Sequence, residues 1–133
     1  MAEFKLHQQL EQDTILIKEL KLSKLLLMND SNYPWFILVP KISNITEIHQ
    51  LSSENQQLLT EEITTISKHL ESSYNADKIN VAALGNMVSQ LHVHIIARFK
   101  SDACWPKPVW GQITAQQYDE AKITEIKKLM SNI

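Results

Sequence analysis

The residues with the clearest chemical potential are two histidines and a glutamine in segment 89–98. Gln90, His92 and His94 alternate there with leucine, valine and isoleucine. This alternation and the β-branched content are typical of a β-strand. Because successive strand side chains point to opposite faces, we expect the amide and both imidazoles in one row, about 6.5–7 Å apart.

Three interpretations of this row remain open from the residues alone. The histidines can be ordinary polar residues of a half-exposed strand. They can be zinc ligands, since two imidazoles on one face suit zinc, but a third ligand is needed and the nearby sequence offers no cysteine or second histidine cluster. They can also form a nucleophilic site, because a neutral imidazole attacks a carbonyl or phosphorus centre when its other nitrogen is held.

The elements that must position this row are predicted to form an α+β fold. Apolar and β-branched runs predict four further strands, and no crossover helix separates most of them. Such strands pair antiparallel, so we expect a five-stranded antiparallel sheet with one long helix and a C-terminal helix. The four predicted strands are residues 14–20, 24–29, 35–40 and 78–84.

Capping and turn residues predict where the helices and the turn before the histidines lie. Ser53 is the expected N-cap of a long helix that ends near residues 74–75. Thr114 is the expected N-cap of the C-terminal helix. Gly85 and Asn86 predict a tight hairpin connection into the histidine strand.

Composition narrows the class of protein. The chain has 133 residues, a net charge of −2 and 44% hydrophobic residues, which predicts one domain over residues 1–133. Nothing indicates a nucleic-acid-binding or membrane surface. The single cysteine, Cys104, excludes an intrachain disulfide, so we expect a reducing cytoplasm.

Together with its flanks, the histidine segment resembles a known family. Residues 85–96, Gly-Asn-Met-Val-Ser-Gln-Leu-His-Val-His-Ile-Ile, resemble the histidine triad signature, His-φ-His-φ-His-φ-φ with φ apolar. Residues 35–41, Trp-Phe-Ile-Leu-Val-Pro-Lys, resemble the family's hydrophobic strand followed by Pro-Lys. The resemblance covers about residues 14–111, with its segments in the family's order.

The resemblance implies a nucleotide-binding, histidine-bearing sheet in a protein that is generally a homodimer. Family members are nucleoside phosphoramidases, dinucleoside polyphosphate hydrolases and nucleotidyltransferases, and the histidine chemistry needs no metal or cofactor. His92 matches the histidine that attacks the α-phosphorus and forms a nucleotidyl-histidine, and His94 matches one that contacts phosphate. We expect the other ring nitrogen of His92 to donate to a backbone carbonyl. The amides of Gln90 and Asn86 and the backbone near Gly85 are expected to stabilise the phosphate.

The chain departs from the family pattern at Gln90, where the first histidine is expected. Glutamine can form hydrogen bonds but cannot transfer a proton as an acid or base. Residues 41–44, after the Pro-Lys segment, also lack the histidine that the family often carries there. We therefore keep two functions beside the zinc alternative: a nucleotide hydrolase or transferase with altered proton transfer to the leaving group, and a nucleotide-binding protein with weak or no catalysis.

Two further segments are candidates for substrate contacts. Asp30 follows the second predicted strand, where the family places an acidic residue on the ribose hydroxyls, although an Asx-turn explains it equally well. Residues 102–111 contain two tryptophans and two prolines, and we expect Trp105 to wall the site or to seal a loop against the core. Arg98 can pair with a phosphate or with a surface carboxylate such as Asp102, and we expect the pair with the carboxylate.

Overall fold

The fold is built on a five-stranded antiparallel sheet, as expected from the sequence. The computed structural model describes residues 3–133. The strands lie side by side in the order β1-β2-β3-β5-β4, so the histidine strand is an interior strand. In chain order they are β1 (Thr14–Glu19), β2 (Ser23–Met28), β3 (Trp35–Pro40), β4 (Lys78–Ala82) and β5 (Val93–Arg98).

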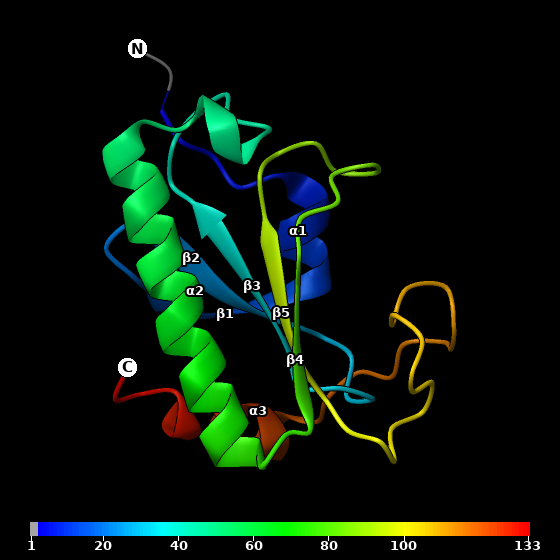
Figure 1. The fold of residues 1–133 in the computed structure, drawn as a ribbon. Helices are drawn as coiled ribbons and strands as arrows, with labels where there is room; N and C mark the ends of the chain where they lie inside the picture. Colours follow the sequence, from blue (N-terminus) through cyan, green and yellow to red (C-terminus); the bar gives the residue numbers. More distant parts are fainter. Residues whose placement is uncertain (1–2) are drawn as a thin grey trace.

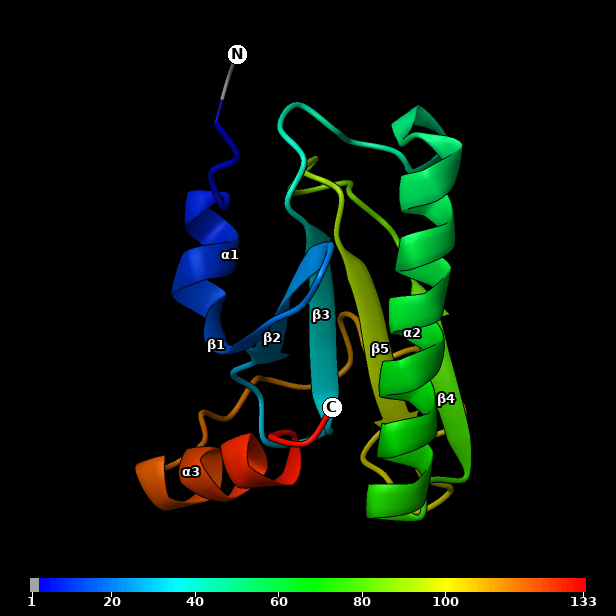
Figure 2. The same cartoon turned by 90° about the vertical axis from the view of Figure 1, so that its left-hand side faces the viewer.

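Helices cover both faces of this sheet. The long helix α2 packs across one face, and the short helix α1 lies on the opposite side (Figures 1 and 2). The helical elements are α1 (Gln8–Asp13), the 3₁₀ turn η1 (Ile48–Gln50), α2 (Ser53–Tyr74) and α3 (Glu120–Leu129). No helix among residues 3–133 combines the length and the apolar character needed to cross a membrane.

The apolar core is divided between the two faces by the alternation of the strands. Leu91, Val93 and Ile95 belong to the cluster beneath α2, as the period of two predicts. Ile96 belongs to the cluster on the other face, together with Trp35. Full burial of such side chains stabilises the fold by about 1.5–3 kcal/mol each, so the sheet that carries the histidines is firmly held.

The bounds of α2 follow its capping residues, with one correction. The helix ends at Tyr74 as expected, because Asn75 adopts the left-handed conformation (φ 52°) and its N–H bonds to the Glu71 carbonyl. The N-cap is Ser52 rather than Ser53, since the Ser52 hydroxyl accepts the Asn55 N–H at 3.1 Å.

The C-terminal helix begins later than the sequence predicts. Thr114 does not cap it, because α3 starts at Glu120 and its N-cap is Asp119, whose carboxylate accepts the Lys122 N–H at 2.8 Å. An ionised aspartate caps strongly because it accepts the bond and also complements the positive end of the helix dipole. Residues 114–118 instead form an irregular segment.

The connection before the histidines is also longer than the predicted hairpin. β4 ends at Ala82, which pairs with His94, and β5 begins only at Val93. Residues 83–92 therefore form an extended loop in which Gly85 has a φ of +74°, a conformation that favours glycine. As a result His92 immediately precedes the strand instead of lying inside it.

Candidate functional site

His92 lies at the junction of this loop and β5, and its ring is held by the main chain. Its Nδ1 is 2.7 Å from the backbone carbonyl oxygen of Gln90. A carbonyl only accepts, so Nδ1 must carry the proton, and the neutral ring then has its free lone pair on Nε2. His92 is 7% exposed. The sequence predicted this carbonyl bond, which leaves a nitrogen suited to nucleophilic attack.

His94 follows on the same face of the sheet and is set in aromatic surroundings. Its ring centroid is 4.9 Å from that of His92, 5.7 Å from that of Trp35 and 5.0 Å from that of Trp110. It is 4% exposed. Burial, with a smaller effect of the neighbouring His92, lowers the pKa of His94 from 6.5 to about 4. His94 is therefore neutral near neutral pH.

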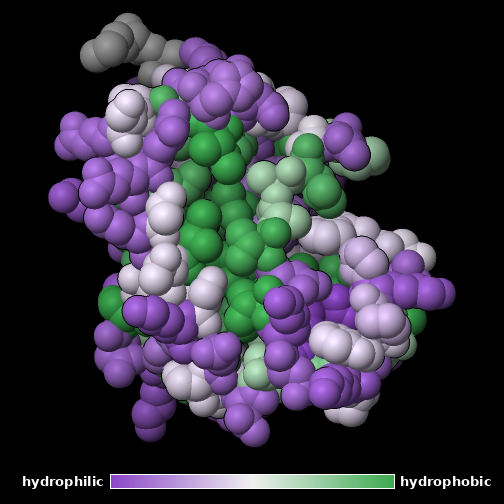
Figure 3. Space-filling model, in the orientation of Figure 1, coloured by the Kyte–Doolittle hydropathy of each residue, from purple (hydrophilic) through white to green (hydrophobic). Residues whose placement is uncertain are grey.

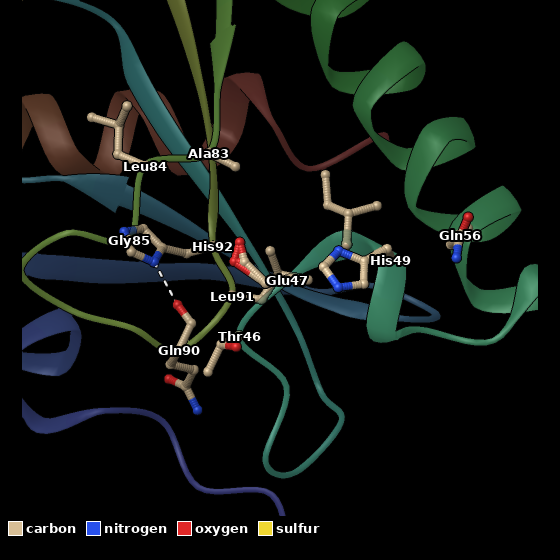
Figure 4. Close-up of a pocket in the computed structure, with 11 residues that line it drawn as sticks. Thr46, Glu47, His49, Gln56, Ala83, Leu84, Gly85, Gln90, Leu91 and His92 are labelled. Atoms are coloured by element: carbon tan, nitrogen blue, oxygen red, sulfur yellow. Dashed lines mark hydrogen bonds between the residues drawn. The ribbon is translucent and has the colours of Figure 1, made fainter.

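A pocket of about 370 Å³ opens beside His92 (Figure 4). Its walls are residues 46–49 around η1, residues 83–85 after β4, residues 90–92 and Gln56 of α2. Oxygen- and nitrogen-bearing side chains from separate segments thus converge at one end of the sheet. No lysine or arginine is among these lining residues, so any anion held here depends on histidines, amides, the Thr46 hydroxyl and backbone N–H groups.

The side chain of Gln90 is bonded to the N-terminal segment in this structure. Its Oε1 accepts the His7 N–H at 2.8 Å, and its Nε2 donates to the Lys5 carbonyl at 2.8 Å. Figure 4 shows its carbonyl turned toward His92 and its side chain turned away. The expected row of three side chains thus contains only the two histidines, because the Gln90 side chain is directed to the N-terminal segment.

The other predicted phosphate contacts lie in the loop between β4 and β5. Gly85 lines the pocket beside His92. A Cβ added to Gly85 would lie 3.7 Å from the Val88 carbonyl oxygen, which is an ordinary contact distance. Glycine is therefore favoured at this position by the positive φ and not by a lack of space. Asn86 is exposed and lies outside the set of lining residues. Of the two, Gly85 is brought to the site.

Asp30 lies in the Asx-type turn that the sequence offered as one explanation. Its Oδ1 accepts the backbone N–H and the side-chain Nδ2 of Asn32 at 3.0 and 2.7 Å. The Gln116 N–H is a third, longer donor to the same oxygen, at 3.3 Å. Asp30 is 5% exposed and does not line the pocket beside His92.

The two tryptophans of segment 102–111 have different environments, and Trp110 rather than Trp105 reaches the histidines. Trp105 lies over the guanidinium of Arg98, whose Cζ is 5.8 Å from the ring centroid. The buried Arg98 pairs with Asp102 as expected, at 2.7 Å. Trp110, in contrast, contacts the rings of His94 and Trp35 edge to face. The aromatic wall of the site is therefore made by Trp110.

The geometry gives no support to the zinc alternative. Among residues 3–133, no group of three histidine, cysteine, aspartate or glutamate side chains is placed to hold a metal ion. His92 and His94 thus lack the third protein ligand that a zinc site requires.

Sequence reasoning missed two kinds of neighbour. Trp35 donates its Nε1–H to His94 Nδ1 at 2.9 Å, although its position at the start of an apolar strand indicated only a core residue. The sequence feature that could have predicted this bond is the indole N–H of Trp35, because a buried indole N–H needs a hydrogen-bond acceptor. Glu47 and His49, which line the pocket, had no distinguishing signal in the sequence.

Comparisons with known proteins fit this architecture. A model of the HIT domain matches residues 9–101. A histidine triad protein from Bradyrhizobium japonicum is 43% identical, with a TM-score of 0.96 over 98% of this chain and 97% of that one. One from Sinorhizobium meliloti is 42% identical (TM-score 0.95, 98% and 97% covered), and one from Marinobacter aquaeolei is 44% identical (TM-score 0.95, 97% and 94% covered). A search of functionally curated proteins found no significant match. The chain belongs to the HIT domain family.

Proposed function

We propose that this protein is a nucleotide hydrolase or transferase that works through a nucleotidyl-His92 intermediate. Membership of the HIT domain family supports a nucleotide-binding or hydrolase/transferase role in general. The observation that carries the finer proposal is the 2.7 Å bond from His92 Nδ1 to the Gln90 carbonyl. It directs the lone pair to Nε2, next to a second imidazole that stays neutral.

The proposed reaction has two displacements at one phosphorus atom. The lone pair of His92 Nε2 attacks the α-phosphorus of a nucleoside phosphoramidate or phosphoanhydride, a P–N bond to His92 forms, and the bond to the leaving group breaks with its electron pair. The leaving group takes a proton from solvent. Water, or another acceptor hydroxyl in a transfer reaction, then attacks the same phosphorus and gives its proton to solvent, and the P–Nε2 bond breaks with its electron pair returning to His92. The products of hydrolysis are a nucleoside monophosphate, the protonated leaving group and free His92. Hydrogen-bond donors from His94 and the backbone near Gly85 stabilise the charge on the phosphoryl oxygens.

The substrate contacts in this proposal follow the family resemblance, and the geometry is used to choose the atoms. The three hydrogen bonds that the Asp30 carboxylate accepts among residues 3–133 all fall on Oδ1, so Oδ2 is the acceptor we assign to the ribose hydroxyls. We keep Asn86, exposed on the loop between β4 and β5, as a candidate phosphate contact, and we assign the aromatic wall of the site to Trp110, which packs against the His94 ring.

Turnover of two substrates tests the proposal. The purified protein is incubated with adenosine 5′-phosphoramidate or diadenosine tetraphosphate, and adenosine monophosphate release is measured. We expect release by the wild-type protein and a loss on the order of 10⁴-fold in His92→Ala. His69→Ala is the matched histidine control, because His69 lies on α2 and bonds to the Leu129 carbonyl. Turnover by His92→Ala as fast as by wild type would overturn the proposal.

A nucleotide-binding protein with weak catalysis is the second candidate, and Gln90 favours it. A side-chain amide carries no proton for a leaving group, and both ends of this amide are bonded to the N-terminal segment. Equilibrium dialysis with adenosine monophosphate, next to the turnover assay, separates the two candidates. Tight binding without release of monophosphate from either substrate supports the second.

We also propose that the protein is a homodimer formed through β4. This strand is an edge of the sheet, and Val81 and Leu84 are 48% and 49% exposed. An apolar stripe runs between α2 and this edge (Figure 3). The other edge, β1, is interrupted by an irregularity between Leu16 and Lys18, which hinders edge pairing. Val81→Lys should yield monomers in sedimentation equilibrium, whereas the control Leu16→Lys should remain dimeric; a monomeric wild type contradicts the proposal.

The free thiol of Cys104 provides an argument about the cellular compartment of the protein. Cys104 is half-buried, and its Sγ lies 3.2 Å from the Tyr33 hydroxyl. A chain with one unpaired thiol is suited to a reducing environment. This supports our proposal that the protein works in the cytoplasm.

A further inference from the structure

The bond between Trp35 and His94 is a buried contact that joins two neighbouring strands. Trp35 lies opposite Ile96 in the β3–β5 register, and Ile37 lies opposite His94, so Trp35 is the diagonal neighbour of His94 on one face. The indole Nε1 is 2.9 Å from His94 Nδ1. The two side chains are 6% and 4% exposed, so bulk water does not compete strongly for this bond.

This bond determines where the proton of His94 lies. An indole nitrogen is a donor only, so Nδ1 must present a lone pair and the proton of neutral His94 must be on Nε2. A doubly protonated ring would set two N–H groups against each other and leave the buried indole without a partner. The low pKa of His94, caused by burial and by His92, agrees with this arrangement.

The other groups around His94 do not determine its tautomer. Trp110 contacts the ring edge to face at 5.0 Å, and no hydrogen bond from it to His94 is recorded among residues 3–133. Ile37 of β3 and Ala82 of β4 are the register partners, and neither titrates. On β5, His92 is the titratable neighbour, at 4.9 Å between ring centroids. Trp35 is therefore the residue through which the tautomer is set.

We propose that Trp35 is a positioning residue that fixes His94 as the neutral Nε2–H tautomer and directs this N–H as a donor toward the group bound beside His92. The part concerning the bound group rests on the proposed function. Under that function, His92 presents a lone pair on Nε2 and His94 presents a proton on Nε2. One ring attacks phosphorus while the other donates to a non-bridging phosphoryl oxygen. No proton leaves His94 during this step.

Nitrogen NMR of the substrate-free protein tests the tautomer without any assay of activity. In ¹⁵N-histidine-labelled wild type we expect His94 to show an unprotonated Nδ1 and a protonated Nε2 near neutral pH. In Trp35→Phe we expect a raised pKa for His94 and partial protonation of Nδ1. Trp110→Phe is the matched control, since it alters ring packing on His94 but removes no donor, and it should leave the tautomer unchanged.

The outcomes separate this inference from the proposed function. If His94 in the wild-type protein carries its proton on Nδ1, the inference is overturned, and this result does not depend on whether Trp35→Phe folds. The inference is also overturned if Trp35→Phe folds and its His94 keeps the wild-type tautomer and pKa. If the protein turns over nucleotides, Trp35→Phe should lower kcat roughly 10- to 100-fold with little change in KM, as loss of a partner that orients a functional histidine does. If the NMR result holds and no turnover is found, the positioning stands and only the catalytic use fails.

Discussion

The ring centroids of His92 and His94 lie 4.9 Å apart, and one ring is bonded to an acceptor while the other is bonded to a donor. A backbone carbonyl accepts from His92, and an indole N–H donates to His94. One imidazole therefore presents a lone pair and its neighbour presents a proton. Two histidines with free tautomers would sample several combinations, so these two partners preorganise the pair before any substrate binds.

The burial of His94 predicts a loss of stability in mild acid. Its pKa is about 4 in the folded protein against 6.5 for an unperturbed histidine, so between these values the unfolded chain binds the proton more strongly. The contribution is fully present above about pH 6.5 and falls as the pH drops toward 4, by up to roughly 3 kcal/mol. Urea unfolding followed by tryptophan fluorescence at several pH values measures it.

The variant His94→Gln should remove this part of the pH dependence. Glutamine does not titrate, so the free energy of unfolding should change less between about pH 6.5 and 4 than in wild type. His49→Gln is the control, because it makes the same substitution at an exposed histidine. If the free energy of unfolding depends on pH equally in wild type and in His94→Gln, the lowered pKa assigned to His94 is wrong.

The buried ion pair between Arg98 and Asp102 is predicted to contribute strongly to the stability of the fold. Burial opposes ionisation of Asp102, but hydrogen bonds from Arg98 and from the Phe99 and Cys104 N–H groups outweigh it and lower its pKa from 3.8 to about 2. The side chains of Arg98 and Asp102 are 1% and 5% exposed. Asp102→Asn leaves a buried guanidinium unpaired and should lower the free energy of unfolding by about 3–5 kcal/mol.

An exposed pair provides the comparison for Asp102. Lys122 and Glu125 also form an ion pair, at 3.5 Å, but with side chains that are 50% and 69% exposed. Glu125→Gln should change the free energy of unfolding by only about 0.5 kcal/mol or less. Similar losses for Asp102→Asn and Glu125→Gln in urea titrations would show that burial of the Arg98 pair has little energetic effect.

Gln90 is predicted to hold the N-terminal segment and not to take part in the chemistry. In Gln90→Ala the His7 amide loses its acceptor, and its hydrogen exchange should speed up roughly fivefold or more. The bond from His92 uses the main-chain carbonyl of residue 90, which alanine retains, so turnover should change by less than about tenfold.

Gln112→Ala serves as the control for this variant, because the Gln112 side chain makes a long 3.5 Å hydrogen bond to the Trp110 carbonyl, far from His7 in the sequence. It should leave exchange at His7 unchanged. A loss of turnover in Gln90→Ala as deep as that in His92→Ala would instead assign the Gln90 amide to the reacting groups.

Local patterns in the sequence predicted the parts of the fold that depend on near neighbours. The alternation in segment 89–98 placed Val93 and Ile95 on the face opposite His94, and the end of α2 followed from the residues near Tyr74. The start of β5 was misplaced, because it depends on where pairing with β4 and β3 stops rather than on the alternation itself.

Contacts between distant residues could not be predicted in this way. Gln90 bonds to Lys5 across 85 positions, and Trp35 bonds to His94 across 59. Both depend on the order of strands in the sheet and on the path of the N-terminal segment. The choice between Trp105 and Trp110 likewise depends on the course of an irregular loop, to which no periodicity applies.

The most direct test of the central claim is to trap the intermediate on His92. Wild-type protein is mixed briefly with adenosine 5′-phosphoramidate, quenched in base, which preserves a P–N bond to imidazole, and examined by intact and peptide mass spectrometry. We predict one adenylyl group per chain, located on His92, removed by acid and missing in His92→Ala. Turnover of this substrate with no such adduct under single-turnover conditions, or an adduct on another residue, would contradict the account.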